Sequence, residues 1–327
     1  MAQAFEHEPV MVEEVVAAFG PVPPGVVVDG TVGAGGHAAT LLAAHQHLGL
    51  LGLDRDPAAV EAARSRLRVF GDRAKVRHAP FAALADEVSA AASHPSTWPA
   101  SGAPAGVVSG VLLDLGVSSP QLDRGGRGFS YRQAAPLDMR MDPSAGITAA
   151  EIVNGASVAE LTAMFVANGE GRLAGRIARA IVAARPIETT DRLADVVAGA
   201  VPAPARRRGH PARRVFQALR IAVNDELAQL EAALPDALGL IVPGGRVAVI
   251  SYHSGEDRLV KAAFAEAAAG GCTCPPGLPC VCGAQPEHRL VFRGARKPSA
   301  AEVERNHRAE SARFRVAERL MPMGADR

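Results

Sequence analysis

Short apolar runs alternate with helix-like stretches along the first third of the chain. The apolar runs are typical of strands buried on both faces of a sheet, and they lie at Val26–Asp29, Leu48–Leu53, Lys75–His78 and Gly110–Leu113. Helices are predicted between them at His37–His47 and Pro57–Val69. This alternation predicts βαβ units and a parallel sheet flanked by helices.

The pattern changes in the middle of the chain, where residues 121–209 carry no convincing buried strand. Helices are predicted there at Ala149–Asn154, Val158–Ala167, Leu173–Ala184 and Arg192–Val201, separated by Gly and Pro. One long helix is expected over Ala212–Ala233, and strand-like segments return at 243–254, Arg289–Phe292 and Phe314–Val316. We therefore expect a discontinuous sheet domain, residues 1–122 and 209–327, interrupted by an all-helical insertion, residues 123–208.

Composition narrows the class of protein. The chain has 327 residues, of which 48% are hydrophobic and 21% charged, so a packed core is expected rather than disorder. No uncharged apolar stretch approaches the roughly 20 residues that span a bilayer, and the N-terminus does not resemble a secretory signal. A cytoplasmic protein without a membrane partner is expected. The net charge of +1 means that any surface for nucleic acid must be a local basic patch.

A glycine-rich loop follows the first predicted strand in VVVDGTVGAGGH (26–37), where four glycines fall within seven positions. Glycine lets backbone N–H groups approach a ligand closely, although a plain tight turn also fits. The loop lacks the Lys-Ser/Thr of a P-loop and is not a clean GxGxxG. A loose D-G-x-x-G-x-G-G pattern better suits a ligand with a cationic amino-acid end, and S-adenosylmethionine fits that description.

Acids follow the first, second and fourth predicted strands. Asp54, about 20 residues after the loop, is placed to accept hydrogen bonds from a ribose. Its alternative role is to cap the helix near Pro57, for which Asp56 is better placed. Asp114 and Gln121 flank the small-residue loop of LLDLGVSSPQLD (112–123), which suits the positioning of an amine for methyl transfer. A strand-ending turn is the plain alternative.

Several longer motifs occur in order along nearly the whole chain, from Glu6 to Arg319. They are HEPVMVEEVV, DGTVGAGGH, LDRDP, LLDLGVSSPQLD, RGFSYR with PLDMRMD, RRVFQALRIAVNDEL, PGGRVAVISYHSGEDRLVK and KPSAAEVERNHRAES. Together they resemble the bacterial ribosomal RNA small subunit methyltransferase H family. That resemblance implies S-adenosylmethionine-dependent N4-methylation of a cytidine in the decoding centre of 16S rRNA.

The resemblance also implies an architecture and a set of site residues. The fold is expected to be α/β, a class I (Rossmann-like) methyltransferase sheet with an inserted helical domain for substrate recognition. Cofactor contacts are expected from Gly35, Gly36, His37, Asp54, Phe81, Asp114 and Gln121. The chemistry of methyl transfer, which requires the amine to be aligned, makes Asp114 and the backbone of Ser118, Ser119 and Pro120 the best catalytic candidates. Small-subunit 16S rRNA is the expected partner, and the sequence leaves a homodimer open.

One departure concerns the aromatic that stacks on the target base. Many amino-methyltransferases carry a [DNS]-P-P-[FY] tetrapeptide, whereas SSPQ (118–121) stands here, without an aromatic. The stacking residue is therefore open among Phe129, Tyr131 and Tyr252, each of which also fits plain packing.

Two further features are candidates for RNA contact. The basic run ARRRGHPARR (205–214) includes Arg206, Arg207 and Arg208, whose guanidinium groups suit phosphate contacts. His253, in SYHSGED, follows a late strand and is expected either to contact RNA or substrate or to be a core or helix-capping histidine.

The four cysteines lie together in CTCPPGLPCVC, as Cys272, Cys274, Cys280 and Cys282. Four thiolates suit tetrahedral zinc, but the spacing differs from the usual C-x₂-C and methyl transfer needs no metal. The sequence therefore leaves two states open for these cysteines, either ligands of a structural zinc ion or reduced thiols without a metal.

Two other functions compete with methyl transfer. A non-catalytic RNA-binding assembly factor that retains the fold would incorporate no methyl groups into small subunits. A dinucleotide-dependent oxidoreductase would bind a different cofactor.

Overall fold

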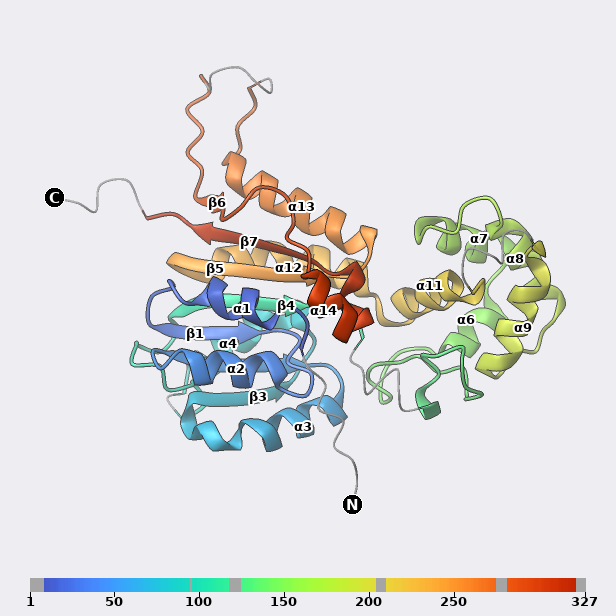
Figure 1. Cartoon of the computed structure of the whole chain (residues 1–327), viewed down its shortest axis with the longest axis horizontal. Coiled ribbons are helices and arrows are strands. Elements are labelled where there is room, and N and C mark those ends of the chain that lie inside the picture. Colours follow the sequence, from blue (N-terminus) through green and yellow to red (C-terminus); the bar gives the residue numbers. More distant parts are fainter. Residues whose placement is uncertain (1–8, 95, 118–124, 204–209, 275–280, 322–327) are drawn as a thin grey trace. The chain divides into compact units, whose positions relative to one another are not determined.

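The chain divides into two compact units in the structure, a computed structural model that describes residues 9–94, 96–117, 125–203, 210–274 and 281–321 (Figure 1). The first unit comprises Met1–Gly116 and Ala228–Arg327, and the second comprises Val117–Leu227. Among the described residues, no helix is both long and apolar enough to cross a membrane.

A seven-stranded sheet with the order β3-β2-β1-β4-β5-β7-β6 forms the centre of the first unit (Figure 1). Its strands are β1 Gly25–Asp29, β2 Leu48–Asp54, β3 Ala74–His78, β4 Val108–Asp114, β5 Ile241–Ser251, β6 His288–Leu290 and β7 Arg313–Arg319. Strands β1 to β5 pair in parallel, whereas β7 pairs antiparallel with both β5 and β6. The predicted strands and the parallel sheet are confirmed.

Helices cover both faces of the sheet. They are α1 Val12–Phe19, α2 Gly36–Ala44, α3 Pro57–Leu67, α4 Leu84–Ala92, α12 Glu226–Leu240, α13 Ser254–Ala269 and the short α14 Ala300–Arg305. Successive side chains of β1 point to opposite faces of the sheet. On one face, Val26 and Val28 pack in a cluster with apolar residues of α4, α12 and α13. Val27 packs on the opposite face with residues of α1 and α2. A strand buried on both faces must be continuously apolar, and for this reason the valine run predicts β1 correctly.

The second unit is helical in its described part. It contains α6 Ala149–Gly155, α7 Val158–Ala167, α8 Ala174–Ala183, α9 Thr190–Ala200 and α11 Ala212–Asn224, and a short 3₁₀ helix at Gly125–Arg127. The other short 3₁₀ helices, at Arg68–Arg73, Phe81–Ala83 and His307–Ser311, belong to the first unit. The four helices predicted between 149 and 201 are confirmed. Helix α11 packs in the apolar core of this unit through residues such as Val215 and Leu219, and not in the sheet domain to which its sequence position, after residue 208, assigns it.

The single long helix expected over Ala212–Ala233 is wrong. Helix α11 ends at Asn224, Asp225 adopts the left-handed conformation (φ 51°), and α12 starts at Glu226. Asp tolerates this conformation better than most residues, and no glycine or proline marks the break in the sequence. Arg220 and Glu226 form a bidentate ion pair across the break, with both N–O distances at 2.8 Å.

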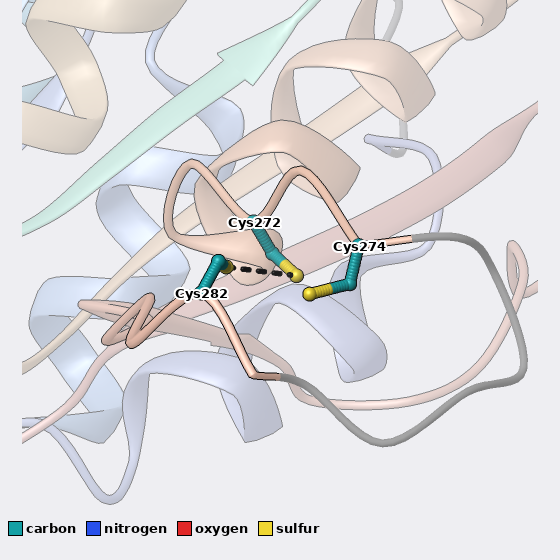
Figure 2. Close-up of side chains that lie close together, drawn as sticks. All are labelled: Cys272, Cys274 and Cys282. Carbon is teal, nitrogen blue, oxygen red and sulfur yellow. Dashed lines mark hydrogen bonds between the residues drawn. The ribbon is translucent and has the colours of Figure 1, made fainter.

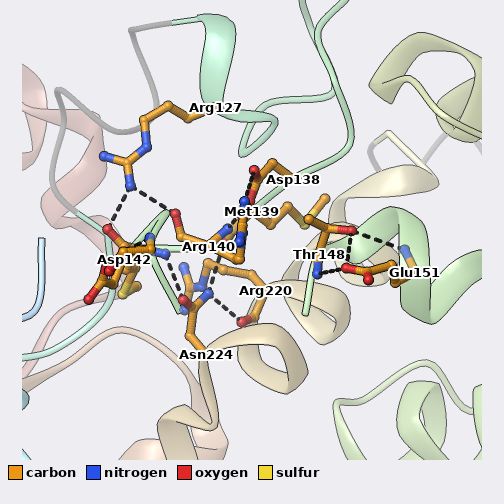
Figure 3. Close-up of polar contacts among 11 residues, drawn as sticks. Arg127, Asp138, Met139, Arg140, Asp142, Thr148, Glu151, Arg220 and Asn224 are labelled. Carbon is orange, nitrogen blue, oxygen red and sulfur yellow. Dashed lines mark hydrogen bonds and ion pairs between the residues drawn. The ribbon is translucent and has the colours of Figure 1, made fainter. Parts of the chain in front are cut away.

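Asn224 ties α11 to the segment PLDMRMD (136–142), as Figure 3 shows. Its amide nitrogen donates to the carbonyl of Met139 at 2.8 Å, and its amide oxygen accepts from the backbone N–H of Met141 at 2.8 Å. Arg127 donates to two carbonyls of the same segment, including that of Met141 at 2.6 Å. Met139 has a positive φ of 63°, so the segment departs there from regular helix or strand, and these side chains supply partners for its backbone groups. This distinctive motif therefore has a structural role in the second unit.

Candidate active site

The carboxyl ends of three neighbouring parallel strands bring three acids to one edge of the sheet. Asp29 ends β1, Asp54 ends β2 and Asp114 ends β4. Strand β1 lies between the other two. This edge is where open parallel sheets bind ligands. All three acids belong to the first unit.

The glycine loop between β1 and α2 is shaped by close packing and by backbone conformation. A Cβ atom on Gly30 would lie 2.6 Å from Cδ2 of Leu113 and 2.9 Å from Cβ of Phe81, so only glycine fits. Gly35 has φ 78° and stands at the N-cap of α2 without a capping side chain. The first N–H groups of α2, beginning at Gly36, therefore receive no cap and suit an anionic ligand group such as a carboxylate.

Asp54 is fixed by backbone amides. Its Oδ2 accepts from the N–H of Gly33 at 2.9 Å, and its Oδ1 accepts from the N–H of Asp56 at 2.8 Å. Each oxygen keeps a second lone pair, which suits two ribose hydroxyls. The alternative capping role belongs to Asp56, whose side chain accepts from the N–H of Ala58 at 3.0 Å at the start of α3.

Asp114 lies at the centre of a hydrogen-bonded group. The hydroxyl of Tyr252 donates to its Oδ1 at 2.8 Å, and its backbone N–H donates to Oγ1 of Thr31 at 2.6 Å. His37 is buried, with Nδ1 3.6 Å from Oδ2 of Asp114 and Nε2 2.9 Å from the carbonyl oxygen of Val10. The side chain of Asp114 is 24% exposed, so it can still reach a ligand.

The site carries an unbalanced negative charge when its acids are ionised. Burial raises the pKa of Asp29 to about 8, against a hydrogen bond from Thr31 that lowers it, and the charges of Asp114 and Asp54 raise it further. Burial likewise raises the pKa of Asp54 to about 6. Burial and the nearby Asp114 charge keep the pKa of Tyr252 well above its usual value, so the phenol donates its hydrogen. The site is therefore suited to a cation.

The remaining candidates from the sequence lie in different places. His253 is the N-cap of α13: its Nδ1 accepts from the N–H groups of Gly255 and Glu256 at 3.1 and 3.4 Å. In the second unit, Phe129 is buried and Tyr131 stacks on His210 with ring centroids 4.4 Å apart. A role of any of them toward RNA stays a prediction. Other predicted residues lie outside the described part of the chain, namely Ser118, Ser119, Pro120, Gln121, Arg206, Arg207, Arg208 and Cys280.

Two features of the site were not singled out from the sequence. Thr31 receives the N–H of Asp114, and only its place inside the glycine loop hinted at a role. Tyr252 was considered as a stacking aromatic, whereas its hydroxyl contacts Asp114. Neither contact has a sequence signal, because residues 31, 114 and 252 meet only through the order of strands.

The order of the strands, the antiparallel β7 and the glycine loop followed by acids at the strand ends define a class I S-adenosylmethionine-dependent methyltransferase. A family model described as the MraW methylase family matches residues 4–320, and the chain belongs to this family. The resemblance noted from the sequence motifs is thereby confirmed, and S-adenosylmethionine is the methyl donor.

Individual relatives cover nearly all of the chain. Ribosomal RNA small subunit methyltransferase H of Heliobacterium modesticaldum is 46% identical over 322 residues, which is 97% of this chain and 99% of the relative. The protein of the same name from Thermobifida fusca is 49% identical over 324 residues, 96% and 93% of the two chains. Among solved structures, an rRNA methylase from Streptococcus thermophilus covers 95% of this chain and 94% of its own, with a TM-score of 0.39 at 10% identity.

Proposed function

We propose that this protein transfers the methyl group of S-adenosylmethionine to N4 of a cytidine in the decoding centre of 16S rRNA, in the small ribosomal subunit and in the cytoplasm. The shared name of the curated relatives supports small-subunit rRNA as the substrate. The target nitrogen and its position rest on the sequence motifs that resemble the family. The cluster of three strand-end carboxyl groups is the observation that carries the cofactor part of the proposal.

These carboxyl groups favour S-adenosylmethionine over the anionic dinucleotide cofactors that other enzymes with a parallel α/β sheet bind. Burial is the main cause of the raised pKa of Asp29, and the negative charges of Asp114 and Asp54 raise it further. A ligand with a sulfonium and an ammonium group relieves the repulsion among these charges, whereas a dinucleotide pyrophosphate adds to it. The uncapped start of α2 at Gly36 then suits the carboxylate of the same ligand. This charge distribution argues against the oxidoreductase alternative.

Asp114 is the best-placed residue to act on the amino group of the base. S-adenosylmethionine supplies an electrophilic methyl group on a sulfonium. N4 of cytosine is a weak nucleophile because its lone pair is delocalised into the ring, and it loses one proton when it gains the methyl group. A carboxylate oxygen that accepts a hydrogen bond from N4 localises this lone pair and aligns the nitrogen. Tyr252 and the backbone contact to Thr31 hold Asp114 in place for that role.

In the proposed reaction, the helical unit and the basic run that includes Arg206–Arg208 bind the RNA. A base inside structured RNA must leave its stack before a methyltransferase can reach an exocyclic nitrogen, so extrusion of the target cytidine is part of the proposal. Phosphate contacts by arginines position the RNA without reading its sequence.

Methyl incorporation tests this proposal directly. Small subunits from bacteria that lack an enzyme of this family are incubated with the protein and tritiated S-adenosylmethionine, and the RNA is then digested to nucleosides. The expected product is N4-methylcytidine within a decoding-centre fragment. Label in another nucleoside or fragment overturns the specificity, and no label at all supports the assembly-factor alternative.

A matched pair of variants tests the role of Asp114. Asp114→Asn is expected to lower kcat/KM by about 100-fold, because the amide keeps an acceptor but loses the charge. Asp72→Asn is the control, since Asp72 is an exposed acid whose side chain pairs only with Lys75 among the contacts described. Equal activities of the two variants would exclude the role given to Asp114.

A further inference from the structure

Cys272, Cys274 and Cys282 lie in the segment of the first unit that connects α13 to β6. The two ends of this segment touch: a Cβ atom on Gly270 would lie 2.6 Å from Cα of Pro286. The N–H of Cys272 donates to the carbonyl of Ala269 at 3.1 Å, and Leu320 donates to Glu287 at 2.7 Å. The segment is therefore anchored at its base.

The sulfur atoms of Cys272, Cys274 and Cys282 converge, as Figure 2 shows, and all lie within 4.8 Å of one another. The Sγ atoms of Cys272 and Cys282 are 3.7 Å apart. Thiolates at about 2.3 Å from a tetrahedral zinc ion have sulfur atoms about 3.8 Å apart. A disulfide would need about 2.0 Å. The observed separation thus matches ligands of a common ion rather than a bonded pair.

A backbone amide donates a hydrogen bond to one sulfur atom of this cluster. The N–H of Val281 donates to Sγ of Cys274 at 3.3 Å. Zinc binds thiolates, and amide donors to the sulfur stabilise the negative charge that a zinc site concentrates.

The segment offers no apolar packing that would explain why three thiols meet. None of its described residues, 271–274 and 281–287, belongs to a hydrophobic core cluster. Val281, the only large aliphatic residue among them, is 89% exposed. Where burial is too small to order a loop, a metal can supply the missing stabilisation.

We propose that Cys272, Cys274 and Cys282 bind one Zn²⁺ ion as thiolates, in a structural site that closes the segment between α13 and β6. Each thiol releases one proton when the ion binds, and no electrons are transferred. The three thiolates leave one position of a tetrahedral ion for a fourth ligand. The strand-end carboxyl groups take no part, so the site is independent of methyl transfer.

Metal analysis of the full chain tests the site. Protein purified in reductant and given one equivalent of zinc before gel filtration is expected to retain about one zinc ion per chain. Cys282→Ser is expected to lower the affinity for zinc at least tenfold. Val281→Thr, a change at the next residue that keeps the backbone donor, is the control and should bind zinc as the parent does.

Cobalt provides a second measurement that does not depend on a variant. Co²⁺ added to the metal-free parent should give intense sulfur-to-cobalt charge-transfer bands. These bands should disappear when added zinc displaces the cobalt. Zinc retention below about 0.1 per chain, cobalt spectra without these bands, or equal zinc affinity of Cys282→Ser and the parent would each overturn the proposal. A disulfide between two of these cysteines, found by mass spectrometry in protein freshly purified in reductant, would do so as well.

Discussion

Asp29 is a buried acid whose cost to stability can be measured. The residue is 1% exposed, and burial raises the pKa of its carboxyl group from 3.8 to about 8. Between these two values the unfolded chain releases the proton while the folded protein retains it. Stability from this group is therefore fully present below about pH 4 and is lost as the pH rises through about 8.

Asp29→Asn removes this titration while keeping an oxygen that accepts from Thr31. At about 1.4 kcal/mol per pH unit, the linkage between about pH 5 and about pH 8.5 amounts to about 4 kcal/mol. The variant should therefore gain about 4 kcal/mol in the free energy of unfolding, relative to the parent, between these two conditions. Comparing the difference at two pH values cancels any cost of the substitution that does not depend on pH.

Urea unfolding of parent and variant at several pH values, without cofactor, is the appropriate assay. The same variant should bind S-adenosylmethionine more weakly in calorimetry at about pH 8.5, because the carboxylate that balances its positive charge is missing. Parallel stability curves for the two proteins would refute the reasoning about Asp29. Tighter cofactor binding by the variant would refute the electrostatic role of the three acids.

Three other predictions concern packing, the helical unit and RNA contact. Gly30→Ala should destabilise the protein by about 1–3 kcal/mol in urea unfolding, because the added methyl group overpacks the loop. Gly199→Ala, at a position in open space on α9, is the control and should stabilise the protein slightly. Similar changes in stability for the two variants would contradict the close packing of the loop. Asn224→Ala should cost about 2–3 kcal/mol, since it leaves buried backbone groups of the segment 136–142 without partners, and a neutral result would contradict this. Neutralising Arg206–Arg208 should weaken RNA association and flatten its salt dependence; a loss of cofactor affinity would defeat that assignment.

The sequence by itself determined the elements of the sheet and the candidate acids. Strands buried on both faces must be continuous apolar runs, and Asp54 and Asp114 follow such runs directly. The glycine loop was visible for the same local reason, because a close approach such as that of Gly30 excludes every side chain. The loop pattern already indicated S-adenosylmethionine, and the longer family motifs then predicted methylation of ribosomal RNA.

Only the tertiary structure decided how residues far apart in the chain act on one another. The contacts of Asp114 with Tyr252 and His37 depend on strand order, and the high pKa of Asp29 depends on burial by neighbours from other strands. The break at Asp225 was hidden because the sequence remains helical on both sides, and the ties of Asn224 to a distant segment are not a local property. Local patterns report local energies, whereas charge repulsion, burial and long-range hydrogen bonds arise only when the chain is folded.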